Sequence, residues 1–519
     1  MSSLVTDLRA TGLELIETHI SRVFLGETEV WKVKKPVSLG FLDFRELSER
    51  KAACDAEVRL NRRLAPEVYL GVVPITVEDG RHRIGGEGPV VDWAVHMVRM
   101  PDRERADVRL ERGELDADGV ERIAGRIAAF HARAADGPRI GRFGTVEAIL
   151  ANVRENFEQT RTAIGEHLPA ADVRTIESYQ LDFLQHHRSL FDARRRAGRI
   201  RDAHGDLRLE QMYLDDEGHP TILDCIEFNE RFRYVDVCAD IAFLSMDLAA
   251  RRRVDLAEVL LAAYARESND YDLYLLVDFY ESYRAFVRGK VATMLANDPS
   301  AETETRSRAA GDARHHFLLA LAAKRPSLMG PAVVAVGGII ASGKSTAARH
   351  LGRHLGGPVI DSDRTRKHLA RVGPTDPLPE EPWAGVYADS MTAKVYEEVF
   401  RRARAVLQSG RPVVIDASFR SRADRRAARV LAEQSGARFY FIECQAPLEV
   451  CRARLGKRAL GPSVSDGREE ILQAFVSRFE PVDELPPEEH ILIDTTGPFE
   501  VNLARLRASI PGWPTGLTG

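Results

Sequence analysis

The sequence predicts two domains of different fold class, an α+β domain followed by an α/β domain. Alternating apolar and polar residues indicate a β-rich lobe over about 1–101, and helical periodicity indicates a mainly helical lobe over about 102–325. Beyond that, apolar runs alternate with helical segments, which predicts a parallel sheet covered by helices on both faces. A stretch with proline and glycine at 326–331 is the expected linker.

The elements of the first domain follow from local patterns. Apolar and polar residues alternate on both sides of a Gly-Glu-Thr turn in 19–35, which predicts a hairpin. Helical spacing over 46–64 predicts a helix, and further strands are expected at 69–77, 90–99 and 221–228.

The second domain is expected over 332–508, with a frayed tail at 509–519. Its first strand is the apolar run VVAVGGI, which is typical of a strand buried inside a parallel sheet. Further strands are expected near 358–361, 413–418, 438–444 and 490–494, with helices between them.

Composition excludes several classes of protein. The chain of 519 residues is 44% hydrophobic and 29% charged, and its net charge is −5, from 73 basic and 78 acidic residues. That balance counts against a partner nucleic acid held by bulk positive charge. No apolar run reaches the ~18 residues of a membrane span, and five widely spaced cysteines favour neither a disulfide framework nor a zinc site. We expect a cytoplasmic protein with no membrane partner.

A phosphate-binding motif stands at the start of the second domain. Gly338–Ser345 fits G-x-x-x-x-G-K-[ST], after an apolar strand and before a helical run. The backbone amides of such a loop and the helix N-terminus bind phosphate oxygens. Lys344 is expected to reach the β- and γ-phosphates, and the Ser345 hydroxyl to bind Mg²⁺. The predicted nucleotide contacts are Gly338, Ser342, Gly343, Lys344, Ser345 and Thr346.

Acidic side chains at strand ends complete this prediction. Asp416 closes the run VVIDAS, where a carboxylate would meet the magnesium ion. Asp363 follows the second strand and is the candidate base for an acceptor hydroxyl, with Asp361 as its rival. Arg366 is expected to hold an anionic acceptor or product.

These segments resemble the small P-loop kinases of the gluconate kinase, shikimate kinase, polynucleotide kinase and zeta-toxin type. VGGIIASGKST, VIDSDRTRK and VVIDAS are similar to their phosphate loop, acceptor-site strand and Walker-B strand. The resemblance implies ATP or GTP as phosphoryl donor, Mg²⁺ as cofactor, and lid arginines that neutralise the transferring phosphoryl group. Arg452, Arg454 and Arg458 in CRARLGKR are the candidates, and the last two are the predicted catalytic arginines; a solvated basic helix face is the alternative.

HGDLRLEQ in the first domain resembles the catalytic loop of aminoglycoside phosphotransferases and other protein-kinase-like enzymes. The resemblance implies that Asp206 orients or deprotonates an acceptor hydroxyl. Gln211 stands where such loops carry a metal-binding Asn, and Asp224 in LeuAspCys matches the second metal ligand. Gln211 offers the same amide oxygen from one methylene further away.

Upstream residues fit the same resemblance. Lys32 matches the strand lysine that contacts the α- and β-phosphates, with Lys34 as a rival, and Glu57 matches its ion-pair partner. His131 matches a helix histidine with a packing role. The first hairpin turn departs from the pattern, because it holds one glycine, Gly26, where related enzymes often have a glycine-rich loop.

The whole layout resembles a bacterial two-domain family that fuses an aminoglycoside phosphotransferase-like domain (1–325) to a P-loop kinase domain (332–508). The expected function is transfer of the γ-phosphoryl of ATP or GTP to a hydroxyl of a small molecule, a sugar or polyol, with the main site in the second domain. The first domain is then a second kinase or a substrate-binding or regulatory unit. The alternatives are a polynucleotide 5′-hydroxyl kinase, suggested by the basic run 364–372, and a nucleotide-binding regulatory protein with an N-terminal pseudokinase.

Overall fold

The computed structural model describes residues 3–18, 20–38, 42–299, 301–376, 384–458, 464–465 and 467–514. The chain forms two compact units. Unit 1 comprises Met1–Arg252 and Phe279–Ala323, and unit 2 comprises Arg253–Asp278 and Lys324–Gly519. The predicted domain boundaries stay a prediction. The compact units differ from them in one respect, because Arg253–Asp278 belongs with the second part of the chain.

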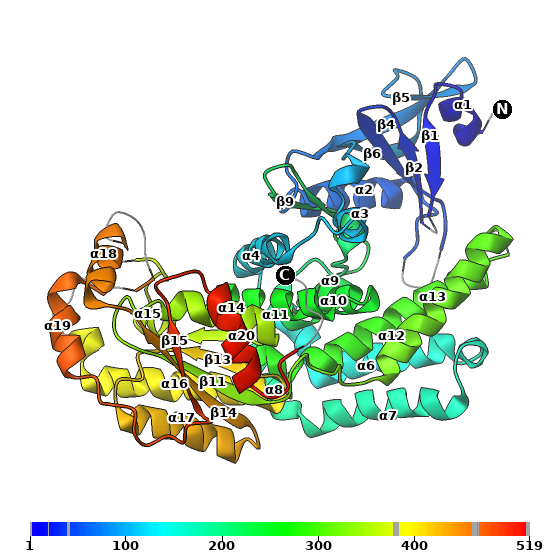
Figure 1. Ribbon diagram of the computed structural model, residues 1–519. Helices are drawn as coiled ribbons and strands as arrows, with labels where there is room; N and C mark the ends of the chain where they lie inside the picture. The colour runs from blue at the N-terminus through cyan, green and yellow to red at the C-terminus, as the bar shows by residue number, and fades with distance from the viewer. Residues whose placement is uncertain are drawn as a thin grey trace. The chain divides into compact units, whose positions relative to one another are not determined.

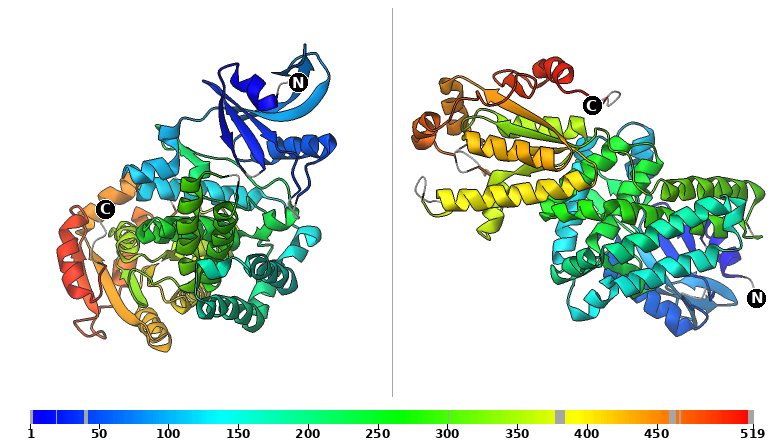
Figure 2. Two further views of the ribbon diagram at one scale, coloured as in Figure 1. Left: turned by 90° about the vertical axis from the view of Figure 1, so that its right-hand side faces the viewer. Right: turned by 90° about the horizontal axis from the view of Figure 1, so that it is seen from below.

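Unit 1 begins with a six-stranded antiparallel sheet in the order β1-β2-β3-β6-β4-β5. Its strands are β1 (Glu14–Glu17), β2 (Ser21–Leu25), β3 (Glu29–Lys34), β4 (Tyr69–Glu78), β5 (Arg81–Ile84) and β6 (Val90–Val98). The predicted hairpin is confirmed as β2 and β3, with Leu25 opposite Val30. The sheet is drawn in blue in Figure 2.

One face of this sheet is covered by the helix α2 (Leu47–Asn61), as its spacing predicts. Cys54 and Val58 of α2 pack against Tyr69 and Val95 of the sheet. The short helix α1 (Leu4–Arg9) packs against the sheet through Leu8, which lies in one cluster with Phe24. This packing fixes α2 beside β3, and therefore Glu57 beside the lysines of that strand.

The rest of unit 1 is mainly helical, with two small two-stranded sheets. Its helices are α3 (Ala106–Glu111), α4 (Ala117–Arg133), α5 (Pro138–Gly141), α6 (Val146–Thr160), α7 (Ala170–His186), α8 (Arg188–Arg196), α9 (Glu230–Arg233), α10 (Val237–Ala250), α12 (Val277–Ala296) and α13 (Thr303–Leu321). Its short strands are β7 (Ile200–Asp202), β8 (Met212–Leu214), β9 (Pro220–Ile222) and β10 (Tyr234–Asp236). The strand expected over 221–228 is therefore shorter than predicted, because the backbone turns at Asp224, where φ is +63°.

Unit 2 contains a five-stranded sheet in the order β12-β13-β11-β14-β15. Every pairing in it is parallel, which confirms the predicted fold class. Its strands are β11 (Ala332–Gly337), β12 (Val359–Asp361), β13 (Val413–Asp416), β14 (Arg438–Gln445) and β15 (His490–Asp494). Since β12 and β13 lie side by side in register, Asp361 stands opposite Asp416 at the carboxyl end of the sheet.

Helices cover both faces of this sheet, as predicted (Figure 1). On one face, α14 (Lys344–Leu355) and α20 (Glu500–Ser509) bury Leu351 and Leu506 against Val334 and Ile442. On the other face, α16 (Asp389–Gln408) and α17 (Arg422–Gln434) contact the strands. The remaining helices of this part are α15 (Ser362–Leu369), α18 (Leu448–Arg458) and α19 (Glu469–Ser477).

The segment Arg253–Asp278 joins unit 2 through buried ion pairs. It contains α11 (Val254–Ser268) and a 3-10 turn over Tyr271–Leu275. Arg411 is fully buried and lies 3.0 Å from carboxylate oxygens of both Glu258 and Asp278. The Tyr271 hydroxyl donates to the backbone oxygen of Val359 at 2.9 Å. The Tyr271 contact attaches the segment to the edge strand β12, and the ion pairs attach it to Arg411, just before β13.

Among the described residues, no helix has both the length and the apolar character needed to cross a membrane.

Candidate functional site

The phosphate loop of unit 2 requires glycine at two positions. Gly338 has φ +135° and Gly343 has φ +91°, conformations that side-chain-bearing residues rarely adopt. A Cβ atom on Gly338 would lie 2.6 Å from the backbone oxygen of Cys444, and one on Gly343 would lie 2.9 Å from Thr495 Cβ. Ala341 also has positive φ, +61°, so the loop is held by its surroundings in a strained turn.

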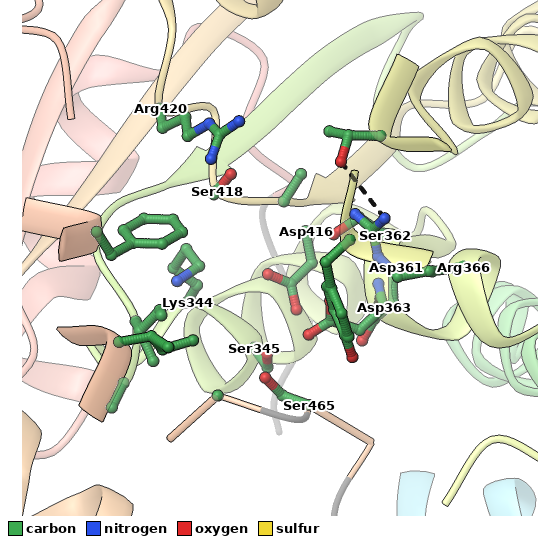
Figure 3. A pocket seen from close by; sticks show the side chains of 18 of the residues that line it. Lys344, Ser345, Asp361, Ser362, Asp363, Arg366, Asp416, Ser418, Arg420 and Ser465 are labelled. Carbon is green, nitrogen blue, oxygen red and sulfur yellow. Dashed lines mark hydrogen bonds between the residues drawn. The ribbon is translucent and has the colours of Figure 1, made fainter. Parts of the chain in front are cut away.

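A cavity of about 220 Å³ lies in front of this loop. Many of the predicted site residues line it: Gly343, Lys344, Ser345, Thr346, Asp361, Asp363, Arg366, Asp416 and Arg458. Gly338, Ser342 and Arg454 do not belong to its lining. Figure 3 shows the acidic side chains gathered between Lys344 on one side and Arg366 on the other. The sheet therefore unites residues that are far apart in the sequence.

Lys344 and the metal-ligand candidates share one buried corner of the cavity. The Lys344 ammonium donates to the backbone oxygen of Ile339 at 2.7 Å. Burial lowers the pKa of Lys344, and the nearby Asp416 carboxylate opposes that shift. Burial raises the pKa of Asp416, while Lys344 and a hydrogen bond from Ser345 act in the opposite direction. A hydroxyl and a carboxylate so placed form an oxygen donor set that fits Mg²⁺.

Asp361 and Asp363 flank the start of α15. Asp361 is the N-cap of that helix, and its carboxylate accepts hydrogen bonds from the backbone N–H groups of Asp363 (2.7 Å) and Arg364 (3.0 Å). Burial and the carboxylates of Asp416 and Asp363 raise the pKa of Asp361 to about 8. Because the Asp361 carboxylate is hydrogen-bonded to the backbone, the Asp363 carboxylate is the better placed of the two to contact an acceptor.

Arg366 lies one turn further along α15 and is 8% exposed. It donates to the backbone oxygen of Val386 at 2.6 Å, and its guanidinium lies 5.1 Å from the ring centroid of Tyr387. Its Nε is buried and has no hydrogen-bond partner among the described residues. Within that part of the chain, no carboxylate lies in ion-pair distance of Arg366, so its charge is available to a ligand.

The three predicted lid arginines occupy different environments. Arg458 lines the cavity. Arg454 instead donates to the backbone oxygen of Ala341 at 3.1 Å and also bonds to the backbone of Thr495, so it supports the phosphate loop from behind. Arg452 is half-exposed, 4.0 Å from Glu469.

Sequence reasoning missed several residues of the cavity wall. Arg420 and Asp424 follow β13, and Tyr387 and Tyr396 come from the region before and within α16. Arg420 lies four residues after Asp416, and its place just beyond a strand end was a signal that could have identified it. The aromatic residues carried no such signal, because their position depends on how α16 packs.

The basic run 364–372 does not form an exposed groove. Arg366 and Lys367 are buried. Arg364 lies 3.2 Å from Glu267. Arg371 of the same run is exposed. The run therefore presents one arginine to solvent, while Arg366 faces the cavity.

In unit 1, two lysines of β3 share one glutamate. Lys32 lies 2.9 Å from Glu57 and 2.6 Å from Asp224, and Lys34 lies 2.5 Å from the other oxygen of Glu57. Lys34 also pairs with Glu227, a buried carboxylate that sequence reasoning missed. Burial alone would lower the pKa of Lys34, but Glu227 and Glu57 raise it above its ordinary range. Of these two lysines, Lys32 is the one that lies within ion-pair distance of the candidate metal ligand Asp224.

The candidate catalytic loop holds Asp206 by side-chain contacts. Arg208 donates from Nε and Nη2 to the two oxygens of Asp206, at 3.1 and 3.0 Å. The Gln211 amide nitrogen donates to the same carboxylate at 3.0 Å and lies 3.4 Å from Asp224. Burial would raise the pKa of Asp206, but Arg208 lowers it well below its usual range.

A buried hydrogen-bond network supports this loop from behind. The carboxylate of Asp240 accepts from the backbone N–H of His204 (2.9 Å) and of Gly205 (2.8 Å). His131 lies 3.0 Å from the same carboxylate. His131 therefore contacts the support of the loop and not Asp206 itself.

Comparisons with known proteins agree with this division. A family model described as "AAA domain" matches residues 333–482, within unit 2. "Uncharacterized protein Rv2004c" of Mycobacterium tuberculosis is 34% identical over 488 residues, which are 94% of this chain and 93% of that protein. "Uncharacterized protein Mb2027c" of Mycobacterium bovis matches with the same identity and coverage.

Solved structures resemble each part of the chain. A gluconokinase from Sinorhizobium meliloti has 20% identity and a TM-score of 0.26, and the match covers 35% of this chain and 92% of that chain. Aminoglycoside 2′-phosphotransferase-IIIa in its GDP complex has 13% identity and a TM-score of 0.37, with 60% of this chain and 97% of that chain covered. Likenesses at these values do not bear on activity or substrate.

Proposed function

For this chain, which belongs to the family of the Mycobacterium tuberculosis protein Rv2004c, we propose a nucleotide-dependent phosphotransferase whose main site is the cavity of unit 2. It moves the γ-phosphoryl of ATP or GTP to a hydroxyl of a small molecule, such as a sugar or polyol. The observation that carries this proposal is the cavity itself. It brings the phosphate loop, two strand-end carboxylates and a buried arginine around one space of about 220 Å³.

The phosphate loop supplies the donor half of the reaction. Its backbone amides and the N-terminus of α14 bind the β- and γ-phosphates, and Lys344 turns from Ile339 toward the phosphate oxygens. Ser345 and Asp416 would hold Mg²⁺, which neutralises charge on the phosphate oxygens. Arg458 reaches the same space and stabilises the transferring group.

The other side of the cavity supplies the acceptor half. Asp363 accepts the proton of the acceptor hydroxyl. The oxygen of that hydroxyl forms a bond to the γ-phosphorus, while the bond between the γ-phosphorus and the β–γ bridging oxygen breaks and the nucleoside diphosphate leaves. Arg366 offers to an electron-rich group of the acceptor a positive charge and an N–H that has no partner among the described residues. Asp361 positions the start of α15 and thereby Asp363.

For unit 1, we propose a kinase-like site built from Lys32, Glu57, Asp206 and Asp224, with Gln211 as the second metal-binding side chain. The ion pair between Lys32 and Glu57 supports it. The variant Asp206→Asn distinguishes phosphoryl transfer at this site from regulation of unit 2.

The test is a screen of sugars, polyols and other hydroxyl compounds with labelled ATP and GTP. Wild-type protein is compared with Lys344→Ala, Asp363→Asn and Asp206→Asn. We expect Lys344→Ala and Asp363→Asn to lose transfer by about a hundredfold or more, as is usual when a positioned acid–base or charge-stabilising group is removed. Full transfer by Lys344→Ala would overturn the assignment of the main site.

Asp206→Asn separates the two roles of unit 1. Loss of transfer to one class of acceptor, with transfer by unit 2 retained, identifies a second kinase. Unchanged transfer to every acceptor together with an altered KM at unit 2 identifies a regulatory unit.

A short oligonucleotide with a 5′-hydroxyl is included among the acceptors. Because Lys367 is buried and Arg364 pairs with Glu267, few charges of the run 364–372 can meet a nucleic-acid backbone, and we expect the oligonucleotide to be a poorer acceptor than the small molecules. Preferred transfer to the oligonucleotide, with a steep dependence on salt, would favour the polynucleotide kinase alternative.

A further inference from the structure

A second, much smaller cavity lies inside unit 1. Its volume is about 30 Å³, room for about two water-sized groups. Its walls come from α6, from the segment that follows Asp224 and from α12; the lining residues with polar side chains include Asn152, Arg231, Asp236, Tyr280, Tyr283 and Arg284. None of them belongs to the clusters around Lys32 or Lys344.

Arg284 is the central feature of this cavity. Its side chain is 5% exposed, and its Nε donates to the backbone oxygen of Ala239 at 3.1 Å. The rings of Phe243 and Tyr283 lie 4.8 and 5.8 Å from the guanidinium carbon. Its Nη2 is buried without a hydrogen-bond partner, and in the described part of the chain no carboxylate lies within 4.0 Å of the guanidinium. An arginine cannot lose its proton. The buried Asp240 carboxylate interacts with this charge, but Nη2 still lacks a hydrogen-bond acceptor, and a buried donor left without one is costly.

Two more polar atoms of the cavity wall are buried without a hydrogen-bond partner among the described residues. Arg231 pairs with Glu155 through Nη1 at 2.6 Å, but its Nε is buried and has no partner among the described residues. Oδ1 of Asn152 is also buried and has no hydrogen-bond partner among the described residues. Two donors on cationic groups and one acceptor, from three separate segments, thus line one space.

The carboxylate that also lines the cavity is already engaged. Asp236 accepts two hydrogen bonds from Arg194, at 2.9 and 2.6 Å, and one from the backbone N–H of Cys238 at 2.8 Å. Its charge is therefore balanced by Arg194. Arg284 lies within 4.0 Å of no carboxylate among the described residues, and its charge acts on Asp240, which is not part of the lining.

We propose that this cavity binds a small oxyanion that carries a hydrogen, of the size and chemistry of hydrogencarbonate. Oxygen atoms of such an ion accept from Arg284 Nη2 and Arg231 Nε, and its hydroxyl donates to Asn152 Oδ1. A bound ion of this kind provides a hydrogen-bond partner for all three of these atoms at once. It is independent of the function proposed for unit 2.

The test measures the unfolding temperature of the full-length protein during titration with sodium hydrogencarbonate. Ionic strength and pH are held constant, and Mg²⁺ with a non-hydrolysable ATP analogue is kept saturating so that the phosphate loop is filled. A ligand that binds only the folded state raises the unfolding temperature along a saturating curve. We expect such a curve for the wild type, and a dissociation constant raised about tenfold or more in Arg284→Gln.

Asn152→Asp is the second variant in case Arg284→Gln does not fold, because the Asn152 side chain makes no hydrogen bond to the described residues that the change would break. The new carboxylate adds a negative charge to the cavity that Arg231 and Arg284 line, and it repels an anion. We therefore expect a higher unfolding temperature without the ion and loss of the saturating response. Arg188→Gln, at an exposed arginine of the same unit, is the matched control and should behave like the wild type.

Three outcomes would overturn the proposal. One is a response that does not saturate, or none at all, as expected for a cavity that holds only water. Another is an unchanged affinity in Asn152→Asp, which would mark an adventitious ion. The third is a chloride affinity equal to that for hydrogencarbonate, because chloride has no hydrogen to donate to Asn152.

Discussion

The amide nitrogen of Gln211 donates to the carboxylate of Asp206 at 3.0 Å, while Gln211 Oε1 is buried with no partner among the described residues. The side chain thus stands between the two carboxylates of the unit 1 site, Asp206 and Asp224. A rotation of the amide would exchange donor and acceptor and present oxygen to a metal ion. The longer side chain at this position is therefore compatible with the metal role that the resemblance implies.

The first prediction concerns this amide. In a Lys344→Ala, Asp416→Asn background, which removes the unit 2 site, we expect Gln211→Leu to weaken binding of Mn²⁺ with ATP about tenfold to a hundredfold, as for other groups that support a metal. Electron paramagnetic resonance of free Mn²⁺ measures this affinity. Gln159→Leu, at an exposed amide of the same unit, is the control. If Gln211→Leu bound Mn²⁺ with ATP as tightly as the background variant does, the Gln211 amide would not be a metal ligand.

The second prediction separates two arginines of α18. Arg454 supports Ala341 in the phosphate loop, whereas Arg458 lines the cavity. We expect Arg454→Gln to raise the Kd for nucleotide and Arg458→Gln to lower kcat with a smaller effect on that Kd. Isothermal titration and steady-state kinetics on the same two variants provide the comparison. The reverse pattern would exchange the two roles.

The third prediction is a pH dependence of stability in protein stripped of metal by a chelator. The pKa of Asp361 is raised to about 8 in the folded state from an ordinary value of 3.8, so the folded state favours the protonated carboxyl. The contribution of Asp361 to stability therefore falls as pH rises from about 4 to about 8. We expect Asp361→Asn, which keeps an N-cap acceptor, to raise the unfolding temperature at pH 8 more than at pH 5. Asp182→Asn, at an exposed carboxylate of α7, should show no such difference; a pH-independent effect of Asp361→Asn would contradict the assignment.

The fourth prediction tests whether Arg253–Asp278 is an integral part of unit 2. Arg411 and Glu258 are both almost completely buried. Glu258→Gln removes one of the two carboxylates that pair with Arg411 and also the partner of Arg325 at 3.1 Å. Loss of one partner of a buried pair costs about 3–5 kcal/mol. Urea unfolding, followed through loss of nucleotide binding, measures the change. Glu304→Gln, in an exposed pair with Arg308, should cost less than about 0.5 kcal/mol; similar losses in both variants would argue against the role of the buried pair.

The length of β9 shows where reasoning from the sequence fell short. The run TILDCIEF has strand character throughout, yet only Pro220–Ile222 pair, with β8. The backbone turns at Asp224 because its N–H is bound by the Tyr69 hydroxyl at 3.1 Å and its carboxylate by Lys32. Both partners lie more than 150 residues away in the chain, so no local pattern could have indicated the turn.

The sequence alone determined the features that depend on neighbouring residues. The phosphate loop is one, since glycines at Gly338 and Gly343 and the helix beginning at Lys344 impose its backbone. The parallel sheet is another, because buried apolar runs separated by helices leave few other arrangements.

The tertiary structure alone decided which distant side chains meet. The strand order placed Asp361 beside Asp416, the helix register separated Arg454 from Arg458, and ion pairs attached Arg253–Asp278 to unit 2. Local preferences act over a few residues, whereas these contacts depend on burial and charge pairing between segments that only the folded chain brings together.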